Sequence, residues 1–298
     1  MKLGMNLFLW DSDVTDEKYL PLFERLKVIG FDGVEVPIFD ARPEAIAALG
    51  RRLDDLGLER KAVTAAGADN TIISDDAGVR QAGIDHVKAV LECCHAGGMD
   101  LLAGPYYAGL GVFSGAGPTE AEWERGVEAF RGLSQDAAAA GVTLALEYLN
   151  RFEIYLLTNA ADARRFVTEV DHPHCRMMID TFHSHIEEKD VGAALRDSAD
   201  LLAHVQLAEN DRSTPGSGQV HWDAVFGALT AVGYDGWLTI EAFGSGLPEL
   251  AAATCIWRRM FDSEDQVAAD GYAFVRDAWA AASADAPDGP RLAASSAS

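Results

Sequence analysis

The sequence has few cysteines and no long apolar run. Its 298 residues include four cysteines, and Cys93 and Cys94 are adjacent, without the Cys-x-x-Cys spacing of metal or redox sites. No run approaches the ~18 apolar residues that span a bilayer, and the first residues do not resemble a signal peptide. We therefore expect a cytoplasmic protein with reduced thiols, free cysteines as structural residues and no membrane partner.

Basic residues are also scarce. The chain has 24 Lys and Arg residues against 47 Asp and Glu residues, a formal net charge of −23. Proteins that bind nucleic acids depend on Lys and Arg to neutralise phosphates, so we expect no nucleic-acid partner. Hydrophobic residues make up 49% of the chain, enough at this length to bury a full core without disulfides.

Short apolar runs alternate with longer amphipathic stretches along the chain. This alternation is typical of βα units with a parallel sheet. Eight such runs occur, at residues 3–10, 33–39, 61–67, 100–108, 142–149, 176–182, 201–210 and 236–243. Eight consecutive units fit a closed barrel better than an open doubly wound sheet, which usually stops at five or six strands. The sequence therefore predicts an α/β fold, a single (β/α)8 TIM barrel.

The barrel is expected to occupy residues 1–283. A final helical stretch, from Leu247 to about Ala282, carries several aromatic residues that we expect to cover the barrel or an oligomer interface. Residues 284–298 consist mainly of Ala, Ser, Asp and Pro without periodicity. They are expected to form a disordered C-terminal tail.

Acidic and amide side chains occur near the ends of the last four apolar runs. Glu147, Asp180, Gln206 and Glu241 are each about one βα unit apart. Barrel enzymes place catalytic groups at the carboxyl ends of their strands, so we expect these four side chains to converge. One such acid alone is often only a helix cap or a surface group. The set of four indicates a site.

Three converging carboxylates repel one another and raise their pKa values unless a cation lies between them. Carboxylate and amide oxygens suit Mg²⁺ or Mn²⁺, whereas tetrahedral zinc sites prefer His and Cys. A divalent metal is therefore implied, with Mn²⁺ or Mg²⁺ expected and Co²⁺ as an alternative.

Four motifs accompany these strand ends: LEYLNRFE at 146–153, IDTFHSHIEE at 179–188, AENDR with PGSG at 208–218, and IEAF at 240–243. Together they resemble the ketose 3-epimerases of the D-tagatose, D-allulose and L-ribulose 3-epimerase group. This group belongs to the xylose-isomerase-like sugar phosphate isomerase/epimerase superfamily. The resemblance implies the xylose-isomerase-like form of the barrel.

The resemblance also implies roles for individual residues. The metal ligands would be Glu147, Asp180, Gln206 and Glu241, and Glu147 and Glu241 would also be the catalytic acid/base pair. The family normally has His at the position of Gln206. His204, which shares a strand face with Gln206, is either a core histidine or a support for the metal site.

Three further residues are implied contacts of the substrate hydroxyls: Glu153, His183 and Arg212. Each has an alternative role. His183 could only cap the segment that follows the sixth strand, and Arg212 could only pair with Glu209 or Asp211. We interpret the PGSG segment as a turn, because it lacks the lysine and the setting of a phosphate-binding loop.

The predicted activity is a metal-dependent sugar epimerase that inverts carbon 3 of a free ketose. A divalent ion would stabilise the enediolate charge, while Glu147 and Glu241 remove and deliver protons on opposite faces of the substrate. We expect a homo-oligomer, a dimer or a tetramer, with a small sugar as substrate.

Other functions remain open at this stage. A lyase or epimerase acting on 3-oxo-glycosides, similar to a C-glycoside deglycosidase subunit with a partner subunit, uses related metal-enolate chemistry. An aldose-ketose isomerase is a further alternative. The acidic charge disfavours an abasic-site endonuclease. Two opposed carboxylates argue against a sugar-binding module without catalysis.

Overall fold

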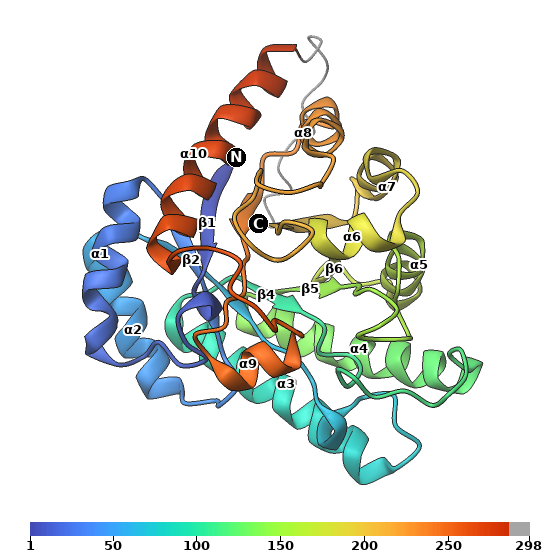
Figure 1. Ribbon diagram of the computed structural model, residues 1–298. Coiled ribbons are helices and arrows are strands. Elements are labelled where there is room, and N and C mark those ends of the chain that lie inside the picture. Colours follow the sequence, from blue (N-terminus) through green and yellow to red (C-terminus); the bar gives the residue numbers. More distant parts are fainter. Residues whose placement is uncertain (286–298) are drawn as a thin grey trace.

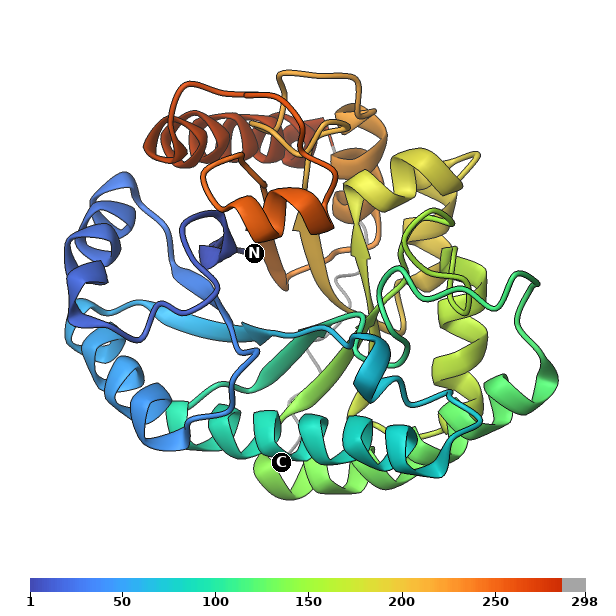
Figure 2. The same cartoon turned by 60° about the horizontal axis from the view of Figure 1, so that its bottom comes forward.

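The computed structural model describes residues 1–285 and shows eight parallel strands closed into a barrel (Figures 1 and 2). Each strand pairs with the next, and β8 pairs with β1. The strands are β1 (Lys2–Asn6), β2 (Gly33–Pro37), β3 (Glu59–Val63), β4 (Leu101–Gly104), β5 (Thr143–Glu147), β6 (Cys175–Asp180), β7 (Leu202–Leu207) and β8 (Trp237–Ile240). Each of the eight apolar runs overlaps one strand, which confirms the predicted single (β/α)8 barrel.

Helices surround the strands as an outer layer (Figure 1). They are α1 (Leu20–Ile29), α2 (Pro43–Leu56), α3 (Ala77–Gly97), α4 (Glu120–Ala140), α5 (Ala160–Val170), α7 (Val191–Ser198), α8 (Trp222–Ala231) and α10 (Glu264–Asp285). Two short helices, α6 (Thr181–Glu187) and α9 (Pro248–Ala253), follow β6 and β8. Within the described residues, no helix combines the length and the apolar character needed to cross a membrane.

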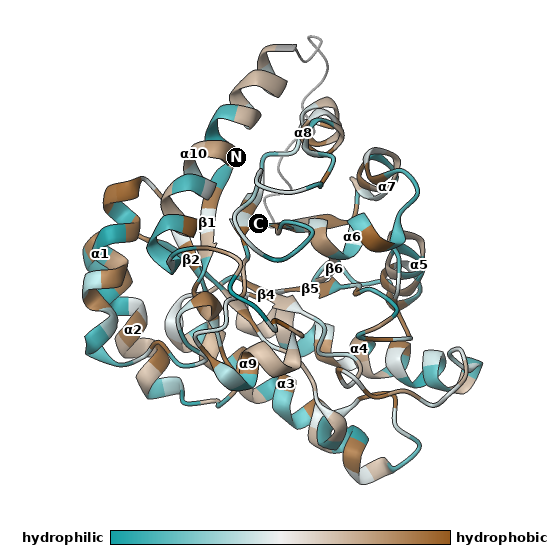
Figure 3. Ribbon diagram, viewed as in Figure 1, coloured by the Kyte–Doolittle hydropathy of each residue, from teal (hydrophilic) through white to brown (hydrophobic). Residues whose placement is uncertain are grey.

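The helices pack inward through one apolar face, and Figure 3 shows brown and teal residues alternating around them. In α2 the buried residues are Ile46, Leu49, Gly50 and Leu53, the three- and four-residue spacing of a single helix face. Several helices end in a left-handed residue. Gly98 ends α3 with φ 69° and Gly141 ends α4 with φ 72°, a conformation that glycine adopts without a Cβ clash.

Three of the strands end in a polar residue: Asn6 in β1, Glu147 in β5 and Asp180 in β6. Asn6 closes β1 by accepting a hydrogen bond from the backbone N–H of Phe8, 2.8 Å away, and a short 3₁₀ helix (Leu7–Leu9) follows. Asp180 closes β6 in the same way and begins α6. Asn6 and Asp180 therefore lie at the carboxyl end of the barrel, where the next segment begins.

The last helical stretch is interrupted, which corrects the expectation of one long region. Between α9 and α10, residues 254–263 are not helical, and Cys255 after α9 is left-handed, with φ 58°. The aromatic residues divide accordingly. Phe274 and Trp279 of α10 pack on Phe226 of α8 and so cover the barrel, whereas Trp257 is 75% exposed.

Helix α10 continues to Asp285, two residues beyond the expected end of the barrel. Residues 286–298, which make up most of the predicted tail, lie outside the described residues.

Candidate active site

The strand ends place the four predicted ligands at the carboxyl end of the barrel. Glu147 ends β5, Asp180 ends β6, Gln206 precedes the last residue of β7, and Glu241 directly follows β8. In the sheet register Asp180 lies opposite Gln206. All four side chains are buried. Asp180 and Glu241 lie close enough for each carboxyl group to influence the pKa of the other.

The three carboxyl groups of this site titrate well above their ordinary range. Burial, followed by repulsion from Glu241 and Asp180, raises the pKa of Glu147 well above its usual value. Burial and repulsion from Asp180 do the same to the pKa of Glu241. Burial also raises the pKa of Asp180 to about 6, although Arg212 and backbone N–H donors oppose the shift. Without a cation, these carboxyl groups therefore keep their protons to higher pH than free carboxyl groups do.

Two buried oxygen atoms at the site have no hydrogen-bond partner: Asp180 Oδ2 and Gln206 Oε1. Such atoms are rare in proteins, because an unpaired buried acceptor costs about 1–3 kcal/mol. Carboxylate and amide oxygens are donors that a hard divalent ion accepts, so the residues present fit the implied metal. In the described part of the chain, no three His, Cys, Asp or Glu side chains are arranged as a ready metal-binding group. The agreement with a metal site therefore rests on the type of ligand atoms.

His183, Arg212 and Glu153 form one cluster with Glu147. His183 Nε2 lies 3.5 Å from Glu147 Oε1 and 3.1 Å from Arg212 Nη2, and Arg212 Nη1 lies 3.3 Å from Glu153 Oε1. These contacts differ from the alternative roles considered for His183 and Arg212. Asp180, not His183, caps α6. Arg212 pairs with Glu153, while Asp211 accepts hydrogen bonds from Ser213.

Arg212 is buried between two aromatic rings, and its guanidinium is only partly hydrogen-bonded. Its guanidinium lies 4.2 Å from the ring centre of Phe182 and 4.9 Å from that of Phe243. Its φ of 60° is a left-handed conformation that is strained for a residue with a Cβ. The Nε and Nη1 atoms have no hydrogen-bond partner. The side chain thus retains N–H groups for the oxygens of a substrate.

Asn150, which sequence reasoning missed, fixes His183 from the opposite side. Its backbone N–H donates to His183 Nδ1 at 3.0 Å, and its side-chain Nδ2 donates to Glu153 Oε1 at 2.9 Å. Burial, reinforced by the positive charge of Arg212, lowers the pKa of His183 well below its usual value. The ring is therefore neutral at physiological pH.

Glu209 holds the loop that carries Arg212. Its carboxylate accepts hydrogen bonds from the backbone N–H groups of Gly216 at 2.8 Å and Val220 at 2.9 Å, and from Trp222 Nε1 at 3.0 Å. Burial raises the pKa of Glu209, but these donors outweigh it and lower the pKa overall. The backbone N–H of Gly216 is already hydrogen-bonded to Glu209 and is not free to bind a phosphate. The PGSG segment is therefore a turn, as interpreted from the sequence.

Asn6 and Glu35, from the first two strands, were also missed. Asn6 Nδ2 donates to Glu35 Oε2 at 2.7 Å and to Glu241 Oε1 at 3.0 Å. Glu35 is fully buried and is the one charged residue between Gly33 and Phe39, a signal that an apolar run rarely carries without reason. His204 belongs to the same group, with Nε2 2.8 Å from Glu35 Oε1.

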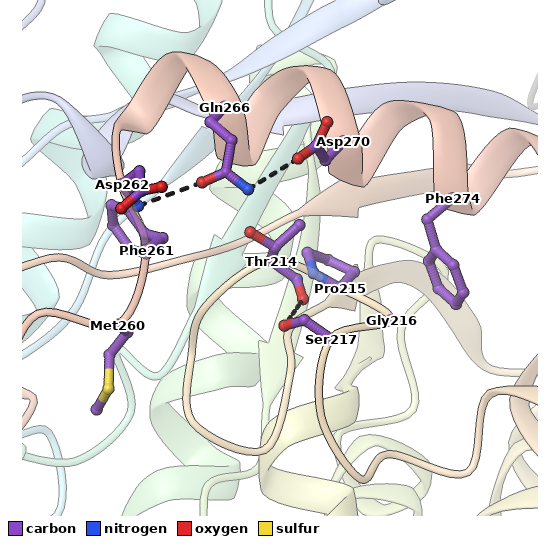
Figure 4. A pocket seen from close by; sticks show the side chains of 10 residues that line it. All are labelled: Thr214, Pro215, Gly216, Ser217, Met260, Phe261, Asp262, Gln266, Asp270 and Phe274. Atoms are coloured by element: carbon purple, nitrogen blue, oxygen red, sulfur yellow. Dashed lines mark hydrogen bonds between the residues drawn. The ribbon is translucent and has the colours of Figure 1, made fainter.

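A cavity of about 490 Å³ lies apart from these residues, between the loop at Thr214–Ser217 and helix α10 (Figure 4). There Gln266 Oε1 accepts from the backbone of Asp262, and its Nε2 donates to Asp270. No residue of the carboxylate cluster lines this cavity. The candidate active site is therefore defined by the strand ends.

A (β/α)8 barrel with buried carboxyl groups, a neutral histidine and a clamped arginine at its strand ends has the architecture of a barrel enzyme. Residues 23–277 match the family model described as "Xylose isomerase-like TIM barrel". The chain belongs to this family.

Its relatives include the L-ribulose 3-epimerase of Mesorhizobium japonicum, 33% identical over 276 residues that cover 92% of this chain and 93% of the relative. The 3-dehydro-D-guloside 4-epimerase of Escherichia coli is 32% identical over 235 residues, 76% of this chain and 87% of the relative. A solved structure of L-ribulose 3-epimerase superimposes with a TM-score of 0.89 at 31% identity, covering 97% of this chain and 99% of the other. These comparisons confirm the resemblance to the ketose 3-epimerase group and the prediction of an isomerase-class enzyme.

Proposed function

We propose that the protein is a divalent-metal-dependent sugar epimerase that inverts carbon 3 of a free ketose. The observation that carries this proposal is the pair of buried carboxyl groups, Glu147 on β5 and Glu241 after β8, both with raised pKa values. The relatives named L-ribulose 3-epimerase and ketose 3-epimerase support it.

Two carboxyl groups with raised pKa values suit a proton exchange on two faces of one carbon. One group, ionised, removes the proton from carbon 3, and the other, protonated, delivers a proton to the opposite face. Because the charge of Glu241 raises the pKa of Glu147, ionisation of one favours protonation of the other. The pair can therefore hold one acid and one base at the same pH.

The residues that would hold the metal are Glu147, Asp180, Gln206 and Glu241, through their carboxylate and amide oxygens. Mn²⁺ or Mg²⁺ suits this donor set best, with Co²⁺ as the alternative. When bound, the ion would supply positive charge that stabilises the negative charge developing on the substrate oxygens as carbon 3 loses its proton.

Arg212, His183 and Glu153 would bind the sugar hydroxyls and orient carbon 3 between the two carboxyl groups. The free N–H groups of Arg212 donate, and Glu153 accepts. A free sugar fits better than a sugar phosphate, because Glu153 already balances the charge of Arg212 and the PGSG turn is occupied by Glu209.

The test is proton NMR in D₂O with the protein, Mn²⁺ and a panel of ketoses. The proposal predicts deuterium at carbon 3 together with the appearance of the 3-epimer, and loss of both on addition of EDTA. Deuterium at carbon 1 or 2 with formation of an aldose would instead indicate an aldose-ketose isomerase.

A second candidate is an epimerase or lyase acting on 3-oxo-glycosides. It is favoured by the 32% identity to the Escherichia coli 4-epimerase and by Gln206 in place of the family's usual His. The same experiment with 3-oxo-glycosides separates the two functions. Deuterium at carbon 4 or release of the aglycone would support this candidate over the ketose 3-epimerase.

We also propose a cytoplasmic homo-oligomer, a dimer or a tetramer. All four cysteines are free, and three of them are buried, which suits a reducing compartment. Analytical ultracentrifugation tests the assembly, and a single species at the mass of one chain would contradict it.

A further inference from the structure

A buried polar network lies beneath the candidate active site, centred on Glu35 of β2. Glu35 has no exposed surface. Its Oε2 atom accepts hydrogen bonds from Gln206 Nε2 at 2.6 Å and from Asn6 Nδ2 at 2.7 Å. Its Oε1 atom lies 2.8 Å from His204 Nε2, at an angle outside hydrogen-bond geometry. One carboxylate thus contacts side chains from β1 and β7.

The hydrogen bond to Glu35 decides which way the amide of Gln206 faces. A primary amide has a donor end and an acceptor end, and only the oxygen can bind a cation or accept a proton. Because Nε2 donates to Glu35, the oxygen Oε1 is turned away from the network. There it is buried without a hydrogen-bond partner.

The Glu35 carboxylate is itself held in place. Asn6 donates both to Glu35 and to Glu241 Oε1, so it ties the network to one of the two proposed acid/base groups. His204 lies opposite Met178 in the sheet and faces the other oxygen of Glu35. The carboxylate therefore has a neighbour at each oxygen and little freedom to release Gln206.

We propose that Glu35 is a positioning residue, which holds the amide of Gln206 with Oε1 directed into the active site. The inference rests on the proposed function, because a cation is the ligand that Oε1 would serve. An imidazole at position 206 could bind a metal through either ring nitrogen, whereas an amide has one usable orientation. Without Glu35, either end of the Gln206 amide could face the active site. This chain therefore depends on Glu35 to direct the oxygen toward the metal.

The test measures Mn²⁺ affinity by titration calorimetry in two variants of matched size. Glu35→Met removes the acceptor and should weaken Mn²⁺ binding at least about 10-fold, the usual effect of losing a residue that orients a metal ligand. Glu35→Gln keeps an acceptor oxygen for Gln206 and should stay within about 3-fold of the native protein. Native affinity in Glu35→Met would overturn the inference.

A double-variant cycle separates positioning from general damage to the fold. In a Gln206→Leu background there is no amide to orient, so adding Glu35→Met should change Mn²⁺ affinity less than about 2-fold. If the two substitutions instead weaken binding additively, Glu35 does not act through Gln206. Thermal melting of the four proteins without metal reports the structural effect on its own.

A measurement on the native protein covers the case in which Glu35→Met does not fold. With ¹⁵N-glutamine labelling, the side-chain NH₂ signal of Gln206, assigned by its absence in Gln206→Leu, should exchange at least about 10-fold more slowly with water than that of exposed Gln219. Equal exchange would overturn the inference. Absence of Mn²⁺ binding and of epimerisation in the native protein would instead refute the proposed function, while slow exchange of the amide would still support its hydrogen bond to Glu35.

Discussion

The two ends of the barrel treat charge in opposite ways. At the amino end of the strands, Lys2 pairs with Glu59 at 2.5 Å, and both side chains are about half exposed. Lys61 is itself buried, but its partner Asp100 has a side chain that is 70% exposed. At the carboxyl end, Glu147 and Glu241 are buried, and the charge of each is opposed by neighbours of the same sign.

The difference shows where the protein accepts a cost in stability. Exposed ion pairs lose little solvation and contribute little energy. Burying a carboxyl group without a matching charge is unfavourable unless the group is protonated or meets a cation. The ion pairs at the amino end therefore cost little stability. The buried carboxyl groups at the carboxyl end are unfavourable in the metal-free chain, which is consistent with the proposed cation site.

The largest difference between the two ends is expected when single carboxylates are removed from each of them. Glu147→Gln and Glu241→Gln should each lower turnover about 10²- to 10⁴-fold, because each removes an acid/base group, while the fold is retained. Exchange of the carbon 3 proton, followed by NMR, measures the effect. Glu59→Gln at the amino end is the matched control and should keep native turnover. Near-native exchange in either active-site variant would contradict the two-carboxylate mechanism.

Replacing the buried acid Asp180 should change how the free energy of unfolding depends on pH. Its folded pKa of about 6 exceeds the ordinary value of 3.8, so the metal-free native state binds the proton more tightly than the unfolded chain. Native stability should fall, relative to Asp180→Asn, as pH rises from about 4 to about 6, by up to roughly 3 kcal/mol. Urea unfolding of both proteins without metal, at pH 4 and pH 7, measures the difference. A constant difference between them would contradict the raised pKa.

A change of ligand at position 206 sharpens the comparison within the carboxyl end. Nitrogen ligands favour later first-row metals, so Gln206→His should tighten Co²⁺ and Ni²⁺ binding about 10-fold more than Mn²⁺ binding. Titration calorimetry with the three ions tests this preference. The same affinity change for all three would mean that position 206 does not contact the metal.

The smallest effect is expected at the exposed amino end. Glu59→Gln breaks the pair with Lys2, in which both side chains are about half exposed, and should cost less than about 1 kcal/mol of unfolding free energy. Chemical denaturation measures it. A loss of several kcal/mol would show that the two ends do not differ in the way described.

The barrel geometry explains which site residues could be predicted from the sequence. The positions of Glu147, Asp180, Gln206 and Glu241 followed from the strand period, because parallel strands end on one side of a barrel. His183 and Arg212 followed from the resemblance.

Glu35 and Asn6 could not be found in this way. Glu35 meets Gln206 across 171 residues of sequence, and Asn6 meets Glu241 across 235. These contacts exist only once β8 closes on β1, which no local pattern records. The break between α9 and α10 could not be predicted either. Its left-handed residue is Cys255, and no glycine marks the end of the helix.

The central claim is that protons compete with a divalent cation for the buried carboxyl groups. Titration calorimetry of the metal-free protein with Mn²⁺ at pH 7, in buffers of different ionisation enthalpy, tests it directly. We predict one ion bound per chain with release of protons, and lower affinity at pH 6 than at pH 8, because the raised pKa values of Glu147, Asp180 and Glu241 make protons compete with the metal. Saturable binding without proton release, or no binding at all, would contradict the claim.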